Sequence, residues 1–152
     1  MKDQKTQTNQ MIALKTPAMS TDSVITFHQD VQAKLDELVE ESYALDDMIA
    51  FIKEYGNDNF IQFYEEYVKQ GEEYDYDVVD VFVEEFGIQN VEHFQDAYYG
   101  QYDSEEQFAE QYTNDVYGEP PAHLVIDWQQ TWATNLSYDF TFADGYIFNS
   151  QF

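Results

Sequence analysis

Residues 139–150 read DFTFADGYIFNS, and this stretch decides the fold of the C-terminal half. Phe140 and Phe142 alternate with polar neighbours, as apolar residues do in a strand with one buried face. Asp144-Gly145 favours a two-residue type I′ turn, in which both turn residues take a positive φ. The stretch therefore predicts a β-hairpin.

A third strand is expected in AYYGQY, residues 97–102, because this segment is rich in aromatic residues. Gly100 inside it indicates a close backbone approach. A short helix over VEHFQDA, residues 91–97, precedes the strand. We expect the strand to join the hairpin in a three-stranded antiparallel sheet.

The clearest helix start in the chain follows this strand. Ser104 and Gln107 form a capping box, in which two backbone N–H groups are satisfied by the two side chains. Phe108 and Tyr112 lie at i, i+4 in the helix, and Gly118 ends it.

Pro120 and Pro121 break the chain after that helix. A final helix is expected from about residue 125 to residue 136. It places three apolar side chains in one row, Trp128, Trp132 and Leu136. Residues 89–152 therefore predict a small α+β domain.

Residues 25–88 predict a helical domain. Apolar side chains recur at helical spacing in segments near 31–39, 45–55 and 59–70. Glycines at the ends of two of these segments, Gly56 and Gly71, are expected to end the helices.

The segment 75–86 is ambiguous, because its valines also favour a buried strand. Its length, Asp75 as a possible N-cap and Gly87 just beyond the end favour a helix. One row of apolar side chains supports this choice, Val78, Phe82 and Phe86.

Residues 1–24 are polar, hold three of the six Lys and lack helical or strand periodicity. We expect a mobile tail there. The predicted fold class is α+β, an elongated molecule with a helical domain at 25–88 and an α+β domain at 89–152.

The chain of 152 residues holds 31 acidic and 6 basic residues, all Lys, for a net charge of -25. Residues 70–152 contain 18 Asp and Glu and no Lys or Arg. Such a surface repels phosphates and anionic lipids, so nucleic-acid and membrane binding are excluded. The 13 Tyr, 12 Phe and 2 Trp indicate a packed interior rather than disorder.

Catalytic chemistry finds little support in the sequence. Absence of Cys excludes thiolate catalysis and disulfides, and fits a reducing cytoplasm. No phosphate-binding glycine loop, nucleophile elbow or EF-hand is present. His93 with Asp96 is a weak metal-ligand pair, and Asp75 with Asp77 leaves loose calcium binding open. We expect no enzyme, no cofactor and no metal site.

Carboxylates gather in stripes on two predicted helices. Like charges three or four residues apart on a helix cost about 0.2–0.5 kcal/mol per pair, so stability alone does not favour these stripes. They could form a solvated face that maintains solubility or reflects salt adaptation. They could also imitate DNA phosphates, since 25 charges correspond to about 43 Å of duplex. The candidate partner-binding residues are Asp75, Asp77, Asp80, Glu84, Glu85, Asp103, Glu105, Glu106, Glu110 and Asp115.

The C-terminal half, FQDAYYGQYDSEEQFAEQYTNDVYGEPPAHLVIDWQQTWATNL and the hairpin ending in YIFNSQF, resembles the last domain of the ArdA antirestriction proteins. The helical region before it is similar to the family's middle domain more loosely. Two departures are the polar tail where the family has a small α/β domain, and Trp128 where it often has Tyr. The matching positions are Tyr98, Tyr99, Gly100, Tyr102, Ser104, Phe108, Ala109, Pro120 or Pro121, Ile126, Asp127 and Phe148.

The resemblance implies a homodimeric DNA mimic made by phages and mobile elements, acting in the host cytoplasm. Such a mimic occupies the DNA-binding groove of type I restriction-modification enzymes. Trp128, Trp132 and the hairpin are candidate dimer contacts. The polar tail replaces the family's N-terminal α/β domain here. The protein could therefore have a different target, or could block DNA cleavage by the enzyme without blocking DNA modification.

Two alternatives remain open. The chain could mimic DNA toward a CRISPR nuclease, a nucleoid protein or a repair enzyme. It could also be an acidic phage interaction protein that imitates nothing, such as a structural adaptor or a calcium-stabilised module.

Overall fold

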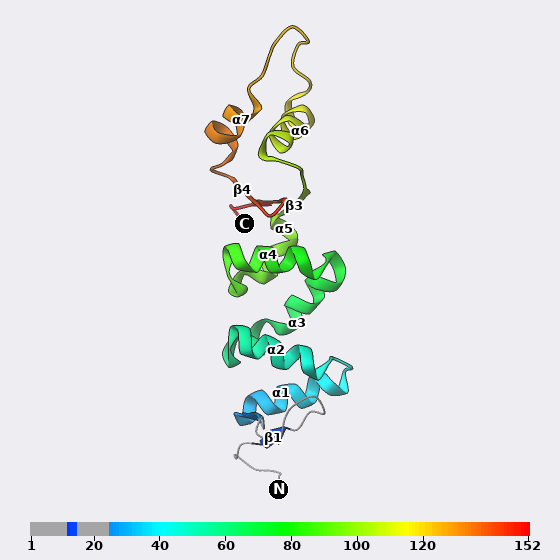
Figure 1. The fold of residues 1–152 in the computed structure, drawn as a ribbon. Helices are drawn as coiled ribbons and strands as arrows, with labels where there is room; N and C mark the ends of the chain where they lie inside the picture. Colours follow the sequence, from blue (N-terminus) through cyan, green and yellow to red (C-terminus); the bar gives the residue numbers. More distant parts are fainter. Residues whose placement is uncertain (1–11, 15–24) are drawn as a thin grey trace. The chain divides into compact units, whose positions relative to one another are not determined.

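The computed structural model describes residues 12–14 and 25–152 (Figure 1). The chain divides into two compact units, and the division falls between Tyr64 and Glu65. Unit 1 is the described part up to Tyr64, and unit 2 is Glu65–Phe152. The helix α3 (Asn57–Tyr74) contains the division.

Unit 1 begins with a small antiparallel hairpin. β1 (Ile12–Leu14) pairs with β2 (Ile25–Phe27). This strand corrects the prediction that residues 1–24 contain no regular element: the short apolar run IAL is matched by ITF, so each satisfies the other's backbone groups. The other residues of the expected tail lie outside the described part of the chain.

The core of unit 1 is built from helices with aromatic contacts. α1 (Gln29–Glu40) and α2 (Leu45–Tyr55) follow the hairpin, and α2 ends at Gly56 as predicted. The Phe51 ring lies 5.1 Å from the Tyr64 ring and 6.4 Å from the Phe60 ring, centroid to centroid. Val31, Leu35 and Leu38 are buried, whereas Val39, which the sequence places in the same stripe, is exposed.

Unit 2 contains the predicted three-stranded antiparallel sheet, in the order β3-β5-β4. The φ angles of Asp144 and Gly145, 53° and 89°, are both positive, which confirms the expected turn between β4 and β5. The fold class is α+β, as predicted. The elements after α3 are α4 (Tyr76–Phe86), η1 (Ile88–His93), α5 (Phe94–Ala97), β3 (Tyr98–Gln101), α6 (Glu105–Tyr117), α7 (Trp128–Thr131), η2 (Trp132–Leu136), β4 (Phe140–Ala143) and β5 (Tyr146–Asn149).

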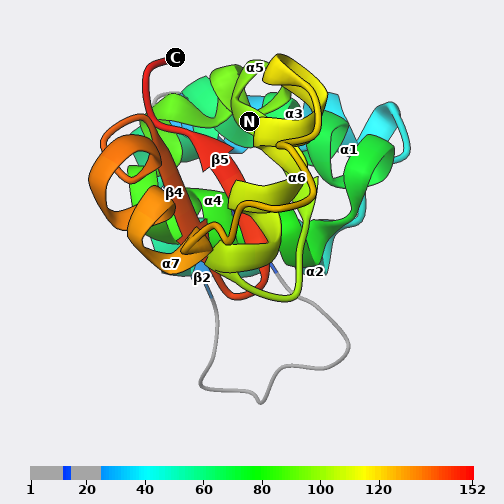
Figure 2. The ribbon, with the colours of Figure 1, turned by 90° about the horizontal axis from the view of Figure 1, so that it is seen from above.

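The sheet forms the middle layer of unit 2. On one face, the Phe148 ring lies 5.4 Å from Phe82 and 6.0 Å from Phe86, so α4 covers this face. On the other face, Ile147 packs with Phe108 of α6 and Trp132 of η2. Neighbouring residues of a strand point to opposite faces, so β5 supplies both cores. The ribbon shows the strands between α4 on one side and α6 and α7 on the other (Figures 1 and 2).

This layering explains why the division lies in α3 and not at residue 88, where the sequence suggested a domain boundary. The sequence places α4 in the helical domain, because its apolar row has the same spacing as the rows of the helices before it. Its row packs on the C-terminal sheet instead, through Phe82 and Phe86. Both Phe82 and Phe86 also contact the Phe152 ring.

Two helix boundaries differ from those predicted. Gly71 does not end α3, which continues to Tyr74. A Cβ at this position would overlap the Tyr76 ring, so a larger residue would displace that ring. The final helix starts at Trp128 instead of residue 125. Asp127 caps it, because its Oδ1 accepts a hydrogen bond from the Gln130 N–H at 3.0 Å.

The predicted glycine in β3 has a conformational role. The register shifts between Tyr98 and Gly100, and Gly100 takes a φ of 134°. Residues with a Cβ rarely adopt this φ, so the glycine permits the irregularity in the strand.

Three tyrosines of unit 2 predict a loss of stability in alkali. Burial is the main cause that raises the pKa of Tyr98, Tyr102 and Tyr112 above 10.0. The Asp115 carboxylate raises the pKa of Tyr102 further. A raised folded pKa gives stability that is complete below the unfolded pKa, near 10, and is lost as pH rises through the folded pKa.

We therefore expect the unfolding midpoint of the protein to fall above about pH 10. Thermal melts followed by far-ultraviolet circular dichroism, at pH steps between about 8 and 11, measure this. A midpoint that stays constant across those steps contradicts the prediction.

Candidate partner-binding surface

The acidic side chains lie on the surface. Every Asp and Glu between residues 25 and 152 is exposed, except Glu66 and Glu105, which are half-buried. Unit 2 contains 20 Asp and Glu and one Lys. That residue, Lys69, is 3.8 Å from a Glu66 carboxylate oxygen. The ten candidate partner-binding residues all belong to unit 2.

Five of the candidates form the α4 group, defined as Asp75, Asp77, Asp80, Glu84 and Glu85. Asp75 is the N-cap of α4 as predicted, since its Oδ1 accepts a hydrogen bond from the Asp77 N–H at 3.2 Å. Asp80 Oδ1 accepts a hydrogen bond from the Tyr67 hydroxyl at 2.6 Å, which joins α4 to α3. Asp77, Glu84 and Glu85 are exposed.

The other five form the α6 group, defined as Asp103, Glu105, Glu106, Glu110 and Asp115. The Ser104 half of the predicted capping box is confirmed, because Ser104 Oγ accepts from the Gln107 N–H at 3.0 Å. The Gln107 side chain reaches back one residue further than predicted, since its Oε1 accepts from the Asp103 N–H at 2.7 Å. Glu105 Oε1 accepts a hydrogen bond from Gln129 Nε2 at 3.4 Å, which links α6 to α7.

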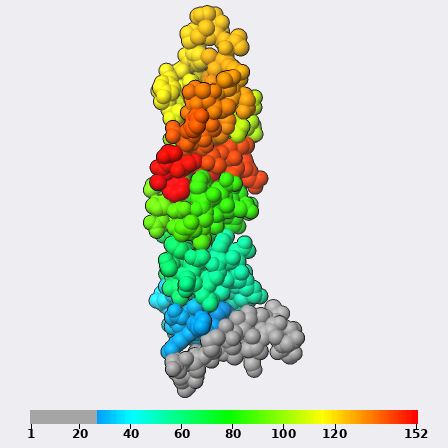
Figure 3. All heavy atoms as spheres, turned by 90° about the vertical axis from the view of Figure 1, so that its left-hand side faces the viewer, coloured from blue at the N-terminus to red at the C-terminus, as the bar shows by residue number. Residues whose placement is uncertain are grey.

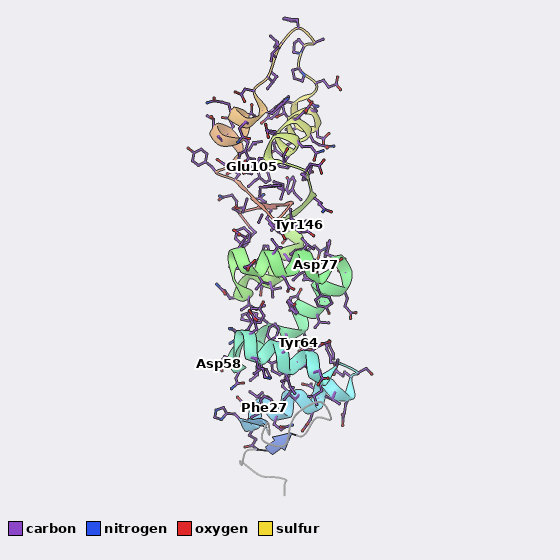
Figure 4. All side chains as sticks on the ribbon, in the orientation of Figure 1. Phe27, Asp58, Tyr64, Asp77, Glu105 and Tyr146 are labelled. Carbon is purple, nitrogen blue, oxygen red and sulfur yellow. The ribbon has the colours of Figure 1, made fainter. Side chains whose placement is uncertain are left out.

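The two groups are carried by helices on opposite faces of the sheet. Asp77 lies on α4 and Glu105 at the start of α6, as Figure 4 shows. The structure therefore does not gather the ten carboxylates into one cluster. It distributes them around unit 2, a pattern that suits recognition by many weak charge contacts rather than by one hot spot.

Three carboxylates occupy positions that oppose helix stability. Glu84 and Glu85 lie in the last turn of α4, and Asp115 lies in the last turn of α6. The negative end of the helix dipole disfavours anions there, and neither last turn carries a basic residue. Glu105 and Glu106, by contrast, lie in the first turn of α6, where the dipole favours them.

Neutralising Glu84 and Glu85 together, as Glu84→Gln and Glu85→Gln, is expected to stabilise the protein. Each change removes an anion from a helix C-terminus, worth about 0.3–1 kcal/mol at low salt. Urea unfolding measures the gain. The matched control, Glu106→Gln in a first turn, is expected to act in the opposite direction. If the free energy of unfolding changes in the same direction in both variants, the dipole argument is wrong.

Trp128 and Trp132, the candidate dimer contacts, pack within their own chain. Trp132 is buried and its ring centroid is 6.0 Å from that of Phe108. Trp128 is half-buried against the same core. This core therefore uses Trp132 and leaves little of its side chain for a partner.

Histidines and carboxylates do not converge on a metal site in the described part of the chain: no group of three or more His, Asp or Glu could hold a metal ion there. The His93 ring stacks on Phe152 at 5.4 Å, and its Nε2 is 3.7 Å from a Glu92 oxygen. Within the same described residues, no helix combines the length and apolar character that crossing a membrane requires.

The sequence does not predict a set of exposed apolar side chains at the end of α6 and in the loop before α7. They lie on both sides of Pro120 and Pro121, where a helix start near residue 125 was expected. The two prolines signal a loop, but composition does not tell an exposed valine from a buried one. Comparison of the chain with protein families, curated proteins and solved structures gives no match.

Proposed function

We propose that this protein is a DNA mimic that occupies the DNA-binding groove of a type I restriction-modification enzyme. One observation carries the proposal: unit 2 presents all 20 of its carboxylates at the surface, with one Lys among them. The homodimer implied by the ArdA resemblance is part of the proposal.

The amount of charge suits such a role. Unit 2 has a net charge of -19 from its 20 acids and one Lys. Duplex DNA carries one charge per roughly 1.7 Å of axis, so this corresponds to about 32 Å of duplex, or about 9–10 base pairs. A groove lined with Lys and Arg for DNA would meet a comparable number of anions on unit 2.

The position of the charge supports binding over stability. Glu84, Glu85 and Asp115 lie where helix dipoles disfavour them. Carboxylates that do not stabilise the fold are best explained by an interaction that needs them. Inhibition would require no bond chemistry and no cofactor.

A competition titration tests the proposal. A labelled duplex is bound to a type I methyltransferase core, and this protein is added at two salt concentrations. We expect stoichiometric displacement that weakens steeply with salt, because charge pairing is screened. The control competitor is a folded acidic protein of similar net charge, which should displace far less.

Displacement that is independent of salt would contradict electrostatic imitation. Absence of displacement would reject this target. If the melting temperature also rose sharply with millimolar calcium and not with monovalent salt, the calcium-stabilised alternative would replace mimicry.

A further inference from the structure

Unit 2 exposes large apolar side chains at the end of α6 and in the loop that follows it. Residues 118–127 join α6 to α7 and contain no helix or strand. The loop extends beyond both helices, at the end of unit 2 away from the sheet (Figures 1 and 3). Its exposed apolar side chains and those of the last α6 residues are Val116 (53% exposed), Tyr117 (79%), Leu124 (50%) and Val125 (97%). We call these four the apolar tip.

The backbone of this loop is restricted. Pro120 and Pro121 fix two φ angles, and the Leu124 N–H donates a hydrogen bond to the Pro121 carbonyl at 3.0 Å. The Asp127 cap and the half-buried Trp128 hold its C-terminal end on unit 2. A restricted loop loses less conformational entropy on binding, so its contacts are more effective.

Carboxylates flank the residues of the apolar tip in the chain. Asp115 and Glu119 adjoin Val116 and Tyr117 in the chain, and Asp127 follows Val125 by two residues. All three carboxylates are exposed. Exposed large apolar side chains among charged residues are typical of an interaction site.

These flanking carboxylates indicate the kind of partner. A second copy of this loop would bring Asp115, Glu119 and Asp127 against identical carboxylates. Nucleic acids and anionic membranes would be repelled in the same way. Charge complementarity favours a protein surface on which Lys and Arg border an apolar pocket.

We propose that the apolar tip inserts into an apolar pocket bordered by basic residues in the DNA-binding partner. The inference rests on the proposed function and gives unit 2 a second mode of contact. The distributed carboxylates speed the encounter, which salt screens. The apolar tip lengthens the lifetime of the complex, to which salt contributes less. Tyr117 is suited to this, because exposed aromatic residues are frequent binding hot spots.

The test uses the double variant Tyr117→Ser, Val125→Ser in the displacement assay with the type I methyltransferase core. Its matched control replaces two exposed apolar residues elsewhere, Tyr138→Ser and Val39→Ser. We expect the tip variant to bind about tenfold to thirtyfold more weakly, through faster dissociation. The dependence of affinity on salt should be unchanged, and the control variant should bind within about twofold of wild type.

Each other outcome overturns the inference. If wild type displaces DNA and the tip variant does so equally well, the tip is not an anchor, although mimicry stands. If the tip variant changes the sedimentation coefficient, the loop belongs to a contact between copies. If wild type fails to displace DNA from the methyltransferase core, the proposed function is wrong, and so is the proposed role of the apolar tip.

Discussion

Neutralising six carboxylates of unit 2 together is expected to weaken displacement of DNA by about tenfold to ten-thousandfold. Exposed charge pairs contribute about 0.2–1 kcal/mol each, so six contribute about 1–6 kcal/mol. The changes are conservative amide substitutions, which preserve the hydrogen bonds that Asp80 and Glu105 accept. The six are Asp77→Asn, Asp80→Asn, Glu84→Gln, Glu105→Gln, Glu106→Gln and Glu110→Gln.

The loss should appear mostly in the association rate. Complementary charge steers the encounter, and removing it also makes affinity less dependent on salt. Stopped-flow association at two salt concentrations measures both effects. The single variant Asp80→Asn should change affinity little, because the charge acts collectively. A large loss from this one change would indicate a local hot spot instead.

The control for this experiment removes the same number of charges from unit 1. If the candidate surface is assigned correctly, this variant retains more affinity than the unit 2 variant at equal net charge. Equal losses would mean that total charge matters and its position does not. The control set is Glu40→Gln, Glu41→Gln, Asp46→Asn, Asp47→Asn, Glu54→Gln and Asp58→Asn, all at exposed positions.

Local signals in the sequence predicted the elements of unit 2 well. The Asp144-Gly145 turn depends on the φ preferences of two neighbouring residues, and the Ser104 capping box on a spacing of three residues. Such signals involve residues close in the chain, so they can be recognised without knowledge of the tertiary structure.

Long-range packing could not be predicted in the same way. A glycine often ends a helix, but α3 continues through Gly71 to Tyr74, and the Tyr76 ring packs against Gly71. The row of Phe82 and Phe86 has the same spacing whether its partner is a helix or a sheet. The structure shows that Phe82 and Phe86 pack on Phe148 of the sheet. The helix α4 therefore belongs to unit 2, and the division between the units lies within α3.

The candidate surface also has a part that the sequence predicts and a part that it does not. Composition alone predicts that the carboxylates are exposed, since desolvating so many anions would be prohibitive. Composition does not predict where apolar side chains lie. Val125 is almost fully exposed, and Trp132, seven residues later, is buried in the core. The apolar tip could therefore be found only in the structure.

Phe148→Ala is expected to destabilise unit 2 by about 3–5 kcal/mol, the usual cost of emptying a buried Phe site. The Phe148 side chain is completely buried. Its ring contacts Phe82 and Phe86 of α4, Phe94 of α5 and Tyr98 of β3, so its loss leaves a cavity between the sheet and one helical layer. Urea unfolding followed by circular dichroism measures the change, and Tyr138→Ala at an exposed position is the control.

The two tryptophans make this variant a test of the layered structure. Trp128 and Trp132 lie on the sheet face opposite Phe148, in or against the core that contains Ile147. If the sheet joins both layers into one cooperative unit, tryptophan fluorescence and circular dichroism should shift by the same amount in Phe148→Ala. The β5 strand supplies Phe148 to one core and Ile147 to the other, so opening one face should open both. A tryptophan transition that remains at its wild-type midpoint, while the circular dichroism transition moves, would show that the two layers unfold independently.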